Sequence, residues 1–264
     1  MYLHVRLGKS RQRRGDCFPH AACYAAVPVA RPAAMSLPRA ILFDLDDTLW
    51  PIGPVIARAE QLVHEWLTAN APRVAGRFSI ESLRSARMAL LQQEPAYHLD
   101  LGALRRAGLH AAFAEVGEDA ASVEQAMQVY YQARNTVELY EDVLPALEEM
   151  NAMMVVGSIS NGNADLETIG LARHFTFSLS AAAHGSAKPD PGIFLAACAA
   201  LNVAPQDAVY VGDDILLDVR GAQRAGLRAV WLNRTGSTRH LEHGVVPDAI
   251  CRNFTELLDW LKQA

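Results

Sequence analysis

The sequence predicts a three-layer α/β fold, in which a Rossmann-like parallel sheet has helices on both faces and carries an inserted all-helical domain. Short apolar runs that read as buried strands alternate with helical segments, which is typical of a parallel sheet. One long stretch, residues 54–137, has helical periodicity throughout. Acidic residues follow the first and fourth apolar runs, at the edge where open α/β sheets bind ligands.

The core is expected to contain six strands with helices between them. We place the strands at 40–45, 153–160, 175–180, 208–213, 228–232 and 248–251. We place the helices at 142–151, 164–171, 190–201, 215–225 and 254–262. The core therefore comprises residues 39–53 and 138–264, and the insertion separates its two parts.

The insertion, residues 54–137, reads as a set of amphipathic helices. Apolar residues recur at helical spacing on its first helix, at Val55, Ala59, Leu62, Val63 and Trp66. Neither strand alternation nor a glycine-containing hairpin turn is apparent in it. Ser122 and Gln125 fit a capping box at the start of a later helix.

The first core strand runs directly into carboxylates. Asp44 and Asp46 alternate at its expected carboxyl end, and Thr48 follows two residues later. Two acids in this position need a cation, and hard divalent cations prefer oxygen ligands. A solvated, acid-rich strand end is the alternative interpretation of this motif by itself.

Two further segments offer groups that bind phosphate. Ser160 and Asn161 follow the second apolar run and supply a hydroxyl and turn amides suited to a phosphoryl oxygen. Lys188 precedes a proline-rich helix start, so its ammonium can be held at the sheet edge. A plain turn and a solvated lysine are the simpler interpretations of each segment alone.

The fourth apolar run ends in Asp213 and Asp214, with Asp218 five residues beyond Asp213. These acids could merely cap the following helix. Separate interpretations of this kind do not explain why each of these strand-terminal loops carries phosphate or metal chemistry. We therefore interpret the motifs together, as one site.

In this order the four motifs resemble the haloacid dehalogenase-like superfamily, over nearly all of residues 39–264. The resemblance implies a phosphatase in which Asp44 is the nucleophile that forms an aspartyl-phosphate and Asp46 is the general acid and base. It also implies that the phosphoryl group binds to Ser160, Asn161 and Lys188. The residue types support such chemistry, because a lysine, a hydroxyl and turn amides can stabilise a transferring phosphoryl group.

A metal ion belongs to the same expectation. A carboxylate that attacks a phosphate dianion faces charge repulsion, so a hard cation must bridge them, and Mg²⁺ fits. By resemblance the metal residues are Asp44, Asp46 through its carbonyl, and Asp213. The supporting residues would be Thr48, Asp214 and Asp218.

Particular residues separate this chain from other branches of the superfamily. The dehalogenases lack the acid at the position of Asp46 and need no metal. Phosphonate-cleaving members use a lysine of the insertion, yet no lysine lies between Pro51 and Leu147. Leu45 stands where P-type ATPases have lysine, and no apolar run reaches about 18 residues.

The insertion resembles the helical cap of one branch, which closes over the site and selects the leaving group. Candidate contacts to the leaving group are Arg58, Tyr97, His98 and Arg105, together with Trp50. For Arg58, His98 and Arg105 a surface role is the simpler interpretation.

Segments 159–164, 183–189 and 211–222 resemble a subgroup of bacterial phosphatases that act on flavin mononucleotide and 5-amino-6-(5-phosphoribitylamino)uracil. That resemblance implies a role in riboflavin biosynthesis. A pyrimidine 5′-nucleotidase or a sugar-phosphate phosphatase is the alternative, because such enzymes share the core. A non-catalytic phosphate-ligand binding protein is the alternative of another class.

Composition sets the remaining expectations. Six basic residues and one acid lie in residues 1–38, although the whole chain has a net charge of −5. We expect this basic tail to be disordered or not translated, with Met35 as the start. The acidic remainder disfavours a nucleic acid polymer as partner and leaves a small phosphorylated metabolite.

The last expectations concern cellular location, membrane association and oligomeric state. Four cysteines without CxxC spacing indicate neither a zinc site nor a disulfide framework, so the cytoplasm is the expected location. We expect no membrane association. The protein would be a monomer or a homodimer.

Overall fold

The computed structural model describes residues 37–238 and 243–263. The expected basic tail, residues 1–38, lies outside the described residues except for its last two positions. No helix among the described residues is both long enough and apolar enough to cross a bilayer.

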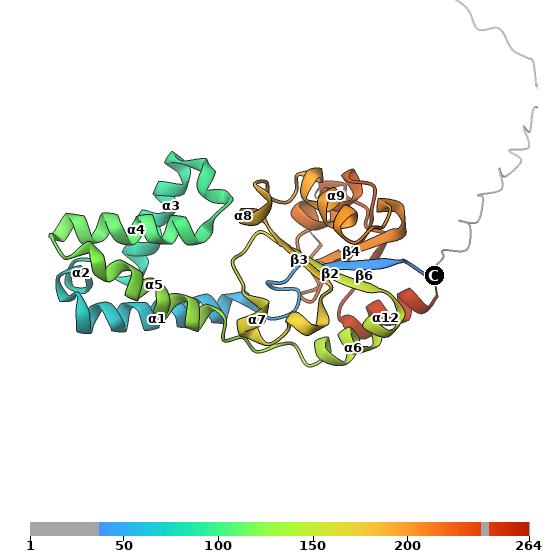
Figure 1. The fold of residues 1–264 in the computed structure, drawn as a ribbon, viewed down its shortest axis with the longest axis horizontal. Helices are drawn as coiled ribbons and strands as arrows, with labels where there is room; N and C mark the ends of the chain where they lie inside the picture. The colour runs from blue at the N-terminus through green and yellow to red at the C-terminus, as the bar shows by residue number, and fades with distance from the viewer. Residues whose placement is uncertain (1–36, 239–242, 264) are drawn as a thin grey trace, which may run out of the picture. The chain divides into compact units, whose positions relative to one another are not determined.

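All six strands of the described chain are parallel and belong to one sheet (Figure 1). Their order is β3-β2-β1-β4-β5-β6, which confirms the predicted fold class. The strands are β1 (Ala40–Phe43), β2 (Val155–Ser160), β3 (Phe177–Ser180), β4 (Ala208–Gly212), β5 (Arg228–Leu232) and β6 (Ala249–Cys251). The first, second and fourth strands are neighbours, because Phe43 pairs with Ser158 on one side and with Val211 on the other.

Alternate residues of β1 face different layers. Ile41 and Phe43 pack against the helices on one face, and Phe43 stacks on Phe254 at 5.3 Å between ring centroids. Ala40 and Leu42 belong to the apolar cluster on the other face. Burial on both faces explains why β1 is apolar at every position.

Helices cover both faces of the sheet. They are α6 (Val143–Met153), α7 (Leu166–Ile169), α8 (Ala181–His184), α9 (Pro191–Ala200), η5 (Ile215–Arg220), α10 (Gly221–Arg224) and α12 (Phe254–Lys262), with short 3₁₀ turns η3 (Ala172–His174) and η4 (Pro205–Asp207). Side chains of α6 and α12 pack on the face of Ile41, and those of α9 and α10 pack on the face of Leu42.

Several expected boundaries were wrong for local reasons. The second strand was expected from residue 153, but Met153 ends α6. The helix expected over 164–171 is much shorter, because the Asp165 side chain caps it and Gly170, with a φ of 87°, ends it. The helix expected over 215–225 begins as the π-helical turn η5 and continues as α10.

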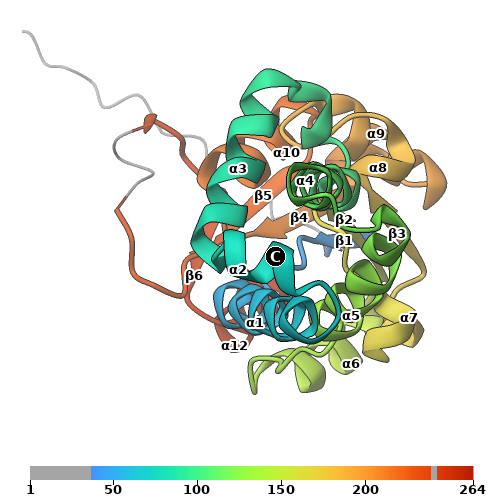
Figure 2. The same ribbon diagram turned by 90° about the vertical axis from the view of Figure 1, so that its left-hand side faces the viewer.

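Residues 52–134 are predominantly helical, as expected for the insertion. They form α1 (Ile52–Asn70), α2 (Pro72–Arg77), α3 (Ile80–Gln93), η1 (Pro95–His98), α4 (Leu101–Val116), η2 (Ala120–Ser122) and α5 (Val123–Arg134), which Figure 2 shows from another side. Val63 of α1, Phe113 of α4 and Met127 of α5 share one apolar cluster. The domain bounds that the sequence suggested stay a prediction.

The capping box expected at Ser122 was wrong. The Ser122 side chain makes no capping hydrogen bond at the start of α5. Asp119 caps the preceding turn η2 instead, by accepting a hydrogen bond from the N–H of Ala121 at 3.0 Å. The side chain that caps this helical segment is therefore that of Asp119, three residues before Ser122.

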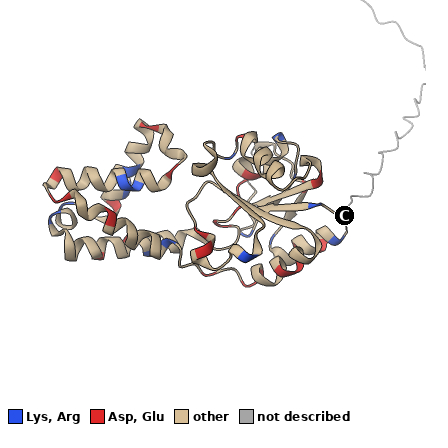
Figure 3. Cartoon of the chain, in the orientation of Figure 1, with Lys and Arg blue, Asp and Glu red and all other residues tan. Residues whose placement is uncertain are grey.

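Charged residues of both signs occur along the insertion and along the helices around the sheet (Figure 3). Two carboxylates beyond the ends of β1 and β4 are largely buried: Asp44, which follows β1 directly, is 7% exposed, and Asp218 of η5 is 1% exposed. Charges held out of water in this way need partners, and those partners define the candidate site.

Candidate active site

Lys188 brings together Asp44, which follows β1, and Asp218, which lies in η5. Its Nζ lies 2.6 Å from Asp44 Oδ1 and 2.6 Å from Asp218 Oδ1. Asp44 follows β1 directly, and its N–H donates to the carbonyl of Val211 in β4 at 2.9 Å. Because β1 and β4 are neighbours, groups 144 and 30 residues from Lys188 in the sequence meet at one ammonium.

Tyr210 completes the surroundings of this ammonium. Lys188 Nζ donates to the Tyr210 hydroxyl at 2.9 Å, and that hydroxyl donates to the carbonyl of Ile159 at 3.0 Å. Burial alone would lower the pKa of Lys188, but the charges of Asp218 and Asp44 raise that pKa well above its ordinary value. Lys188 is therefore a fixed positive charge. The sequence did not reveal Tyr210, because its strand reads as uniformly apolar.

Three carboxylates form a candidate cation site. Asp44, Asp213 and Asp218 each offer an oxygen within 4.8 Å of the others. Burial raises the pKa of Asp44 to about 7, although the Lys188 charge opposes this. Burial and the charges of Asp218 and Asp44 raise the pKa of Asp213 to about 8. Asp44 and Asp213 are thus hard to ionise, which fits a hard divalent cation that would stabilise their charged forms.

The loop after β4 holds Asp218 in place. Asp218 Oδ2 accepts from the N–H of Asp214 at 2.9 Å, and Asp214 Oδ1 accepts from the N–H groups of Leu216 and Leu217. Asp214 is thus a helix cap. A Cβ added to Gly212 would lie 2.3 Å from Asp218 Cγ, so this position requires glycine.

Asp46 has different partners from Asp44. Arg134 Nη2 donates to both carboxylate oxygens of Asp46 at 2.7 Å, and Trp50 Nε1 donates to Oδ1 at 2.9 Å. Burial raises the pKa of Asp46, and the Arg134 charge opposes the rise. Trp50 is completely buried, so the expectation that it forms a leaving-group surface was wrong. Its indole binds the acid instead.

Thr48 belongs to the interior of the loop after β1. It is fully buried, and its carbonyl accepts from the Arg234 guanidinium at 3.3 Å. Its Oγ1 has no partner among the described residues. Thr48 therefore contributes to the loop that carries Asp44 and Asp46.

Ser160 ends β2 and Asn161 follows it directly, as expected. Ser160 is 5% exposed, and its Oγ accepts from the N–H of Gly162 at 2.9 Å. The Asn161 side chain accepts from the N–H of Lys188 at 2.8 Å and donates to the Lys188 carbonyl at 3.0 Å. The Asn161 amide therefore holds the lysine loop against the end of β2.

The candidate residues of the insertion have varied surroundings. Arg58 Nη2 donates to the carbonyls of Ala133 and Thr136, so it ties α1 to the end of α5. Tyr97 is half-buried and His98 is exposed, and both lie in η1. No hydrogen bond links any of these side chains to Asp44, Asp46 or Lys188 within the described part of the chain.

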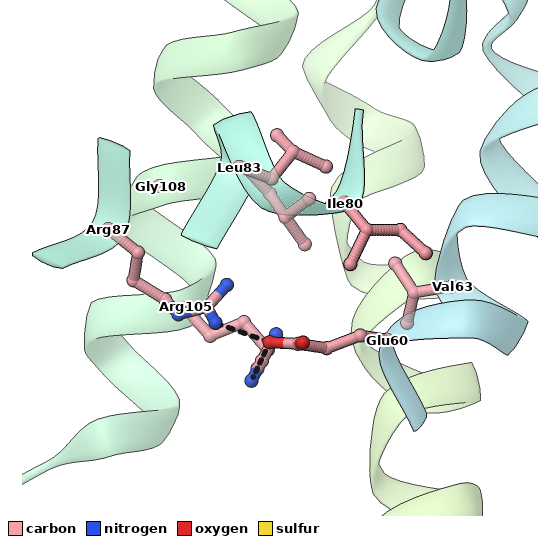
Figure 4. Close-up of a pocket in the computed structure, with 8 residues that line it drawn as sticks. Glu60, Val63, Ile80, Leu83, Arg87, Arg105 and Gly108 are labelled. Carbon is pink, nitrogen blue, oxygen red and sulfur yellow. Dashed lines mark hydrogen bonds and ion pairs between the residues drawn. The ribbon is translucent and has the colours of Figure 1, made fainter. Parts of the chain in front are cut away.

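Arg105 lies in the interior of the insertion. Figure 4 shows it pointing toward Glu60, which also binds Arg87. Arg105 Nη2 is 3.4 Å from Glu60 Oε1, and its guanidinium lies 3.8 Å from the centre of the Tyr130 ring. The adjoining cavity measures about 20 Å³, close to the space that one water needs. These contacts are those of a packing residue.

Residues 38–226 match the family of haloacid dehalogenase-like hydrolases. The chain belongs to this family. Its motifs and fold therefore confirm the resemblance, and the protein is an enzyme of the hydrolase class. The loops that carry Asp44, Ser160, Lys188 and Asp213 all lie within the matched residues.

Curated relatives cover most of the chain. It is 32% identical to the 5-amino-6-(5-phospho-D-ribitylamino)uracil phosphatase YigB of Escherichia coli K12, over 73% of this chain and 82% of that protein. It is 31% identical to a phosphoserine phosphatase of Thermus thermophilus, over 74% and 88% of the two chains.

The solved structures similar to this chain include both dehalogenases and phosphatases. A 2-haloacid dehalogenase from Pseudomonas syringae pv. Tomato DC3000 has a TM-score of 0.79 and 36% identity, covering 85% of this chain and 98% of its own. A HAD phosphatase from Thermococcus onnurineus has a TM-score of 0.60 and 25% identity, covering 84% and 97%. Overall similarity to these structures does not distinguish a dehalogenase from a phosphatase. The distinction must therefore be made from the residues of the site.

Proposed function

We propose that this hydrolase is a Mg²⁺-dependent phosphatase that hydrolyses small phosphomonoesters through an aspartyl-phosphate on Asp44. The observation that carries the proposal is the second acid, Asp46, held two residues after the nucleophile by Arg134 and Trp50. Cleavage of a phosphate ester needs a proton for the leaving oxygen, and Asp46 can supply it. The relatives named as phosphatases support the same reaction.

The chain's own groups account for both half-reactions. Asp44 attacks phosphorus, the ester bond breaks, and Asp46 gives its proton to the departing oxygen. Asp46 then takes a proton from water, which attacks the aspartyl-phosphate and releases inorganic phosphate from Asp44. Lys188 stabilises negative charge on the transferring group throughout, and the Ser160 hydroxyl binds one of its oxygens.

The metal site would consist of Asp44, Asp213 and the carbonyl of Asp46. When bound there, Mg²⁺ would offset the repulsion between the Asp44 carboxylate and the phosphate dianion. Asp44 and Asp218 both bind the Lys188 ammonium, and Asp213 adds a third carboxylate to the group, so the excess of acids supports the assignment. Asp218 would orient Lys188 at the edge of this site.

The candidate substrates are flavin mononucleotide and 5-amino-6-(5-phosphoribitylamino)uracil, which the similarity to the Escherichia coli enzyme supports. Phosphoserine and sugar phosphates are the competing candidates, because other relatives are named for phosphoserine and for glyceraldehyde 3-phosphate. A panel of these monoesters should give Mg²⁺-dependent phosphate release, with the highest kcat/KM for a ribityl phosphate. No release from any monoester would favour a phosphate-binding protein.

Mg²⁺ should stabilise the protein more near pH 8 than near pH 6. The folded-state pKa of Asp213, about 8, lies above its ordinary value of 3.8. Between these two pH values the folded protein binds more protons than the unfolded chain, so the stability of the fold decreases as pH rises. Mg²⁺ must displace those protons, so its affinity increases with pH. The increase in Tm on adding Mg²⁺ measures this. Equal increases at both pH values, or an unchanged increase in Asp213→Asn, would contradict the metal assignment.

Leaving-group specificity should depend on η1 of the insertion. We expect Tyr97→Ala and His98→Ala to lower kcat/KM for the preferred substrate about tenfold and to spare p-nitrophenyl phosphate, whose phosphoryl group meets the same core residues. Arg58→Ala tests the remaining candidate at the start of α1. An unchanged ratio between the two substrates in all three variants would place specificity elsewhere.

A further inference from the structure

The two donors that hold Asp46 lie at the two ends of the helical segment 52–134, Trp50 just before it and Arg134 as its last residue. Trp50 lies two residues before the first residue of α1, and Arg134 is the last residue of α5. The chain therefore passes Asp46 once as it leaves the sheet and again as it returns. Arg58 of α1 joins these two passages, because it donates to the carbonyls of Ala133 and Thr136 on either side of Arg134.

The contacts distinguish the two oxygens of Asp46. Oδ1 accepts from both Trp50 Nε1 and Arg134 Nη2, whereas Oδ2 accepts from Arg134 Nη2 alone. A carboxylate oxygen has two main lone-pair directions, so Oδ2 keeps one of them for another partner. The main chain fixes the same loop, since the N–H of Asp47 donates to the Trp50 carbonyl at 2.8 Å.

Oδ2 also faces the phosphate-binding turn. A Cβ added to Gly162 would lie 2.6 Å from Asp46 Oδ2 and 3.2 Å from Ser160 Oγ. Both oxygens therefore border the same small space, which exists because residue 162 is glycine. Arg134 Nη2 lies 3.5 Å from that position and closes the space on a third side.

Arg134 is not explained by stability alone. It is 1% exposed, and its Nη1 is buried without a hydrogen-bond partner among the described residues. A buried donor without a partner is unfavourable, and a buried ion pair is often no more stable than an apolar replacement. What the burial of Arg134 provides is the contact of its Nη2 with Asp46.

We propose that Arg134 and Trp50 are positioning residues that orient Asp46 so that Oδ2 is the oxygen that exchanges its proton with the leaving group. This inference rests on the proposed phosphatase activity. It extends that proposal by assigning the acid–base oxygen and by making its orientation depend on both ends of the helical segment 52–134. Neither residue contacts the reacting atoms in this scheme, since each acts through the Asp46 carboxylate.

The test compares two leaving groups in the full-length protein. p-Nitrophenolate departs readily without a proton, whereas an alkoxide requires one, so a misplaced acid harms alkyl esters more. The variants are Trp50→Phe, which removes one donor, and Arg134→Met and Arg134→Lys, which remove the guanidinium with and without its charge. The readout is kcat/KM, which reports phosphoryl transfer to Asp44, for p-nitrophenyl phosphate and for the alkyl phosphomonoester that the wild type cleaves fastest.

Arg105→Met is the matched control, because Arg105 is another buried arginine of the insertion with its own carboxylate partner, Glu60. We expect Arg134→Met to lower the alkyl-to-aryl ratio of kcat/KM by about tenfold or more, Trp50→Phe to lower it less, and Arg134→Lys to restore part of it. Arg105→Met should leave the ratio unchanged even where it lowers Tm.

Each other outcome contradicts the proposal in a distinguishable way. Equal losses on both esters, or a similar change of the ratio in Arg105→Met, would make Arg134 a structural residue. If Arg134→Met does not fold, an unchanged ratio in Trp50→Phe would refute the positioning role. Absence of phosphate release by the wild type would refute the phosphatase proposal itself, and the positioning role with it.

Discussion

Asp44→Asn should release no phosphate above background from any monoester. An amide nitrogen or oxygen cannot form the aspartyl-phosphate, so both half-reactions are lost. The fold should survive, because burial already favours the neutral form of this side chain by raising the pKa of Asp44 to about 7. Lys188 would keep Asp218 and Tyr210 as partners.

The measurement is steady-state phosphate release together with a thermal melt of the same purified protein. Asp100→Asn is a suitable control, because Asp100 caps α4 by accepting from the N–H of Ala103 at 2.8 Å and lies outside the site. It should keep full turnover. Substantial activity in Asp44→Asn, with a normal melt, would show that another residue attacks phosphorus.

Lys188→Ala should reduce kcat about 100- to 1,000-fold, or roughly 2.7 to 4 kcal/mol of transition-state stabilisation, as expected for loss of one preorganised charge-stabilising donor. The structure adds a second consequence. Asp44 and Asp218 would remain buried at 7% and 1% exposure without their shared ammonium, so Tm should fall as well. Mg²⁺ should recover part of that loss.

Lys262→Ala provides the matched control, because Lys262 is an exposed lysine whose partner is Glu149 at 2.7 Å. Neither its turnover nor its Tm should change appreciably, since exposed ion pairs contribute little. A decrease of less than about fivefold in Lys188→Ala would mean that Lys188 does not act on the phosphoryl group.

The sequence predicted the residues that follow strands better than those that approach from elsewhere. Asp44, Ser160 and Asp213 could be placed together, because parallel strands end at one edge of a sheet. The contact of Arg134 with Asp46 could not be predicted, because the two residues are 88 positions apart and no local sequence pattern relates them. Tyr210 was hidden for another reason, since an aromatic residue inside an apolar strand reads as core.

The spacing of apolar residues predicted where helices occur, but it did not predict where they end. The insertion is helical as its apolar spacing indicates, yet short competing caps such as Asp119 and Asp165 moved individual boundaries. Periodicity also could not assign polar partners inside the insertion. Arg105 was a candidate for substrate contact from its sequence position, but its side chain packs over Tyr130 and pairs with Glu60.

Trapping the phosphorylated enzyme gives the most direct measurement of the proposed mechanism. The protein is quenched in acid during turnover of its best monoester with Mg²⁺, reduced with borohydride, digested and examined by peptide mass spectrometry. Reduction converts an aspartyl-phosphate to homoserine. We expect homoserine at position 44 and nowhere else, with none in the absence of substrate. Rapid phosphate release with an unmodified Asp44, or with the label on another residue, would contradict the mechanism.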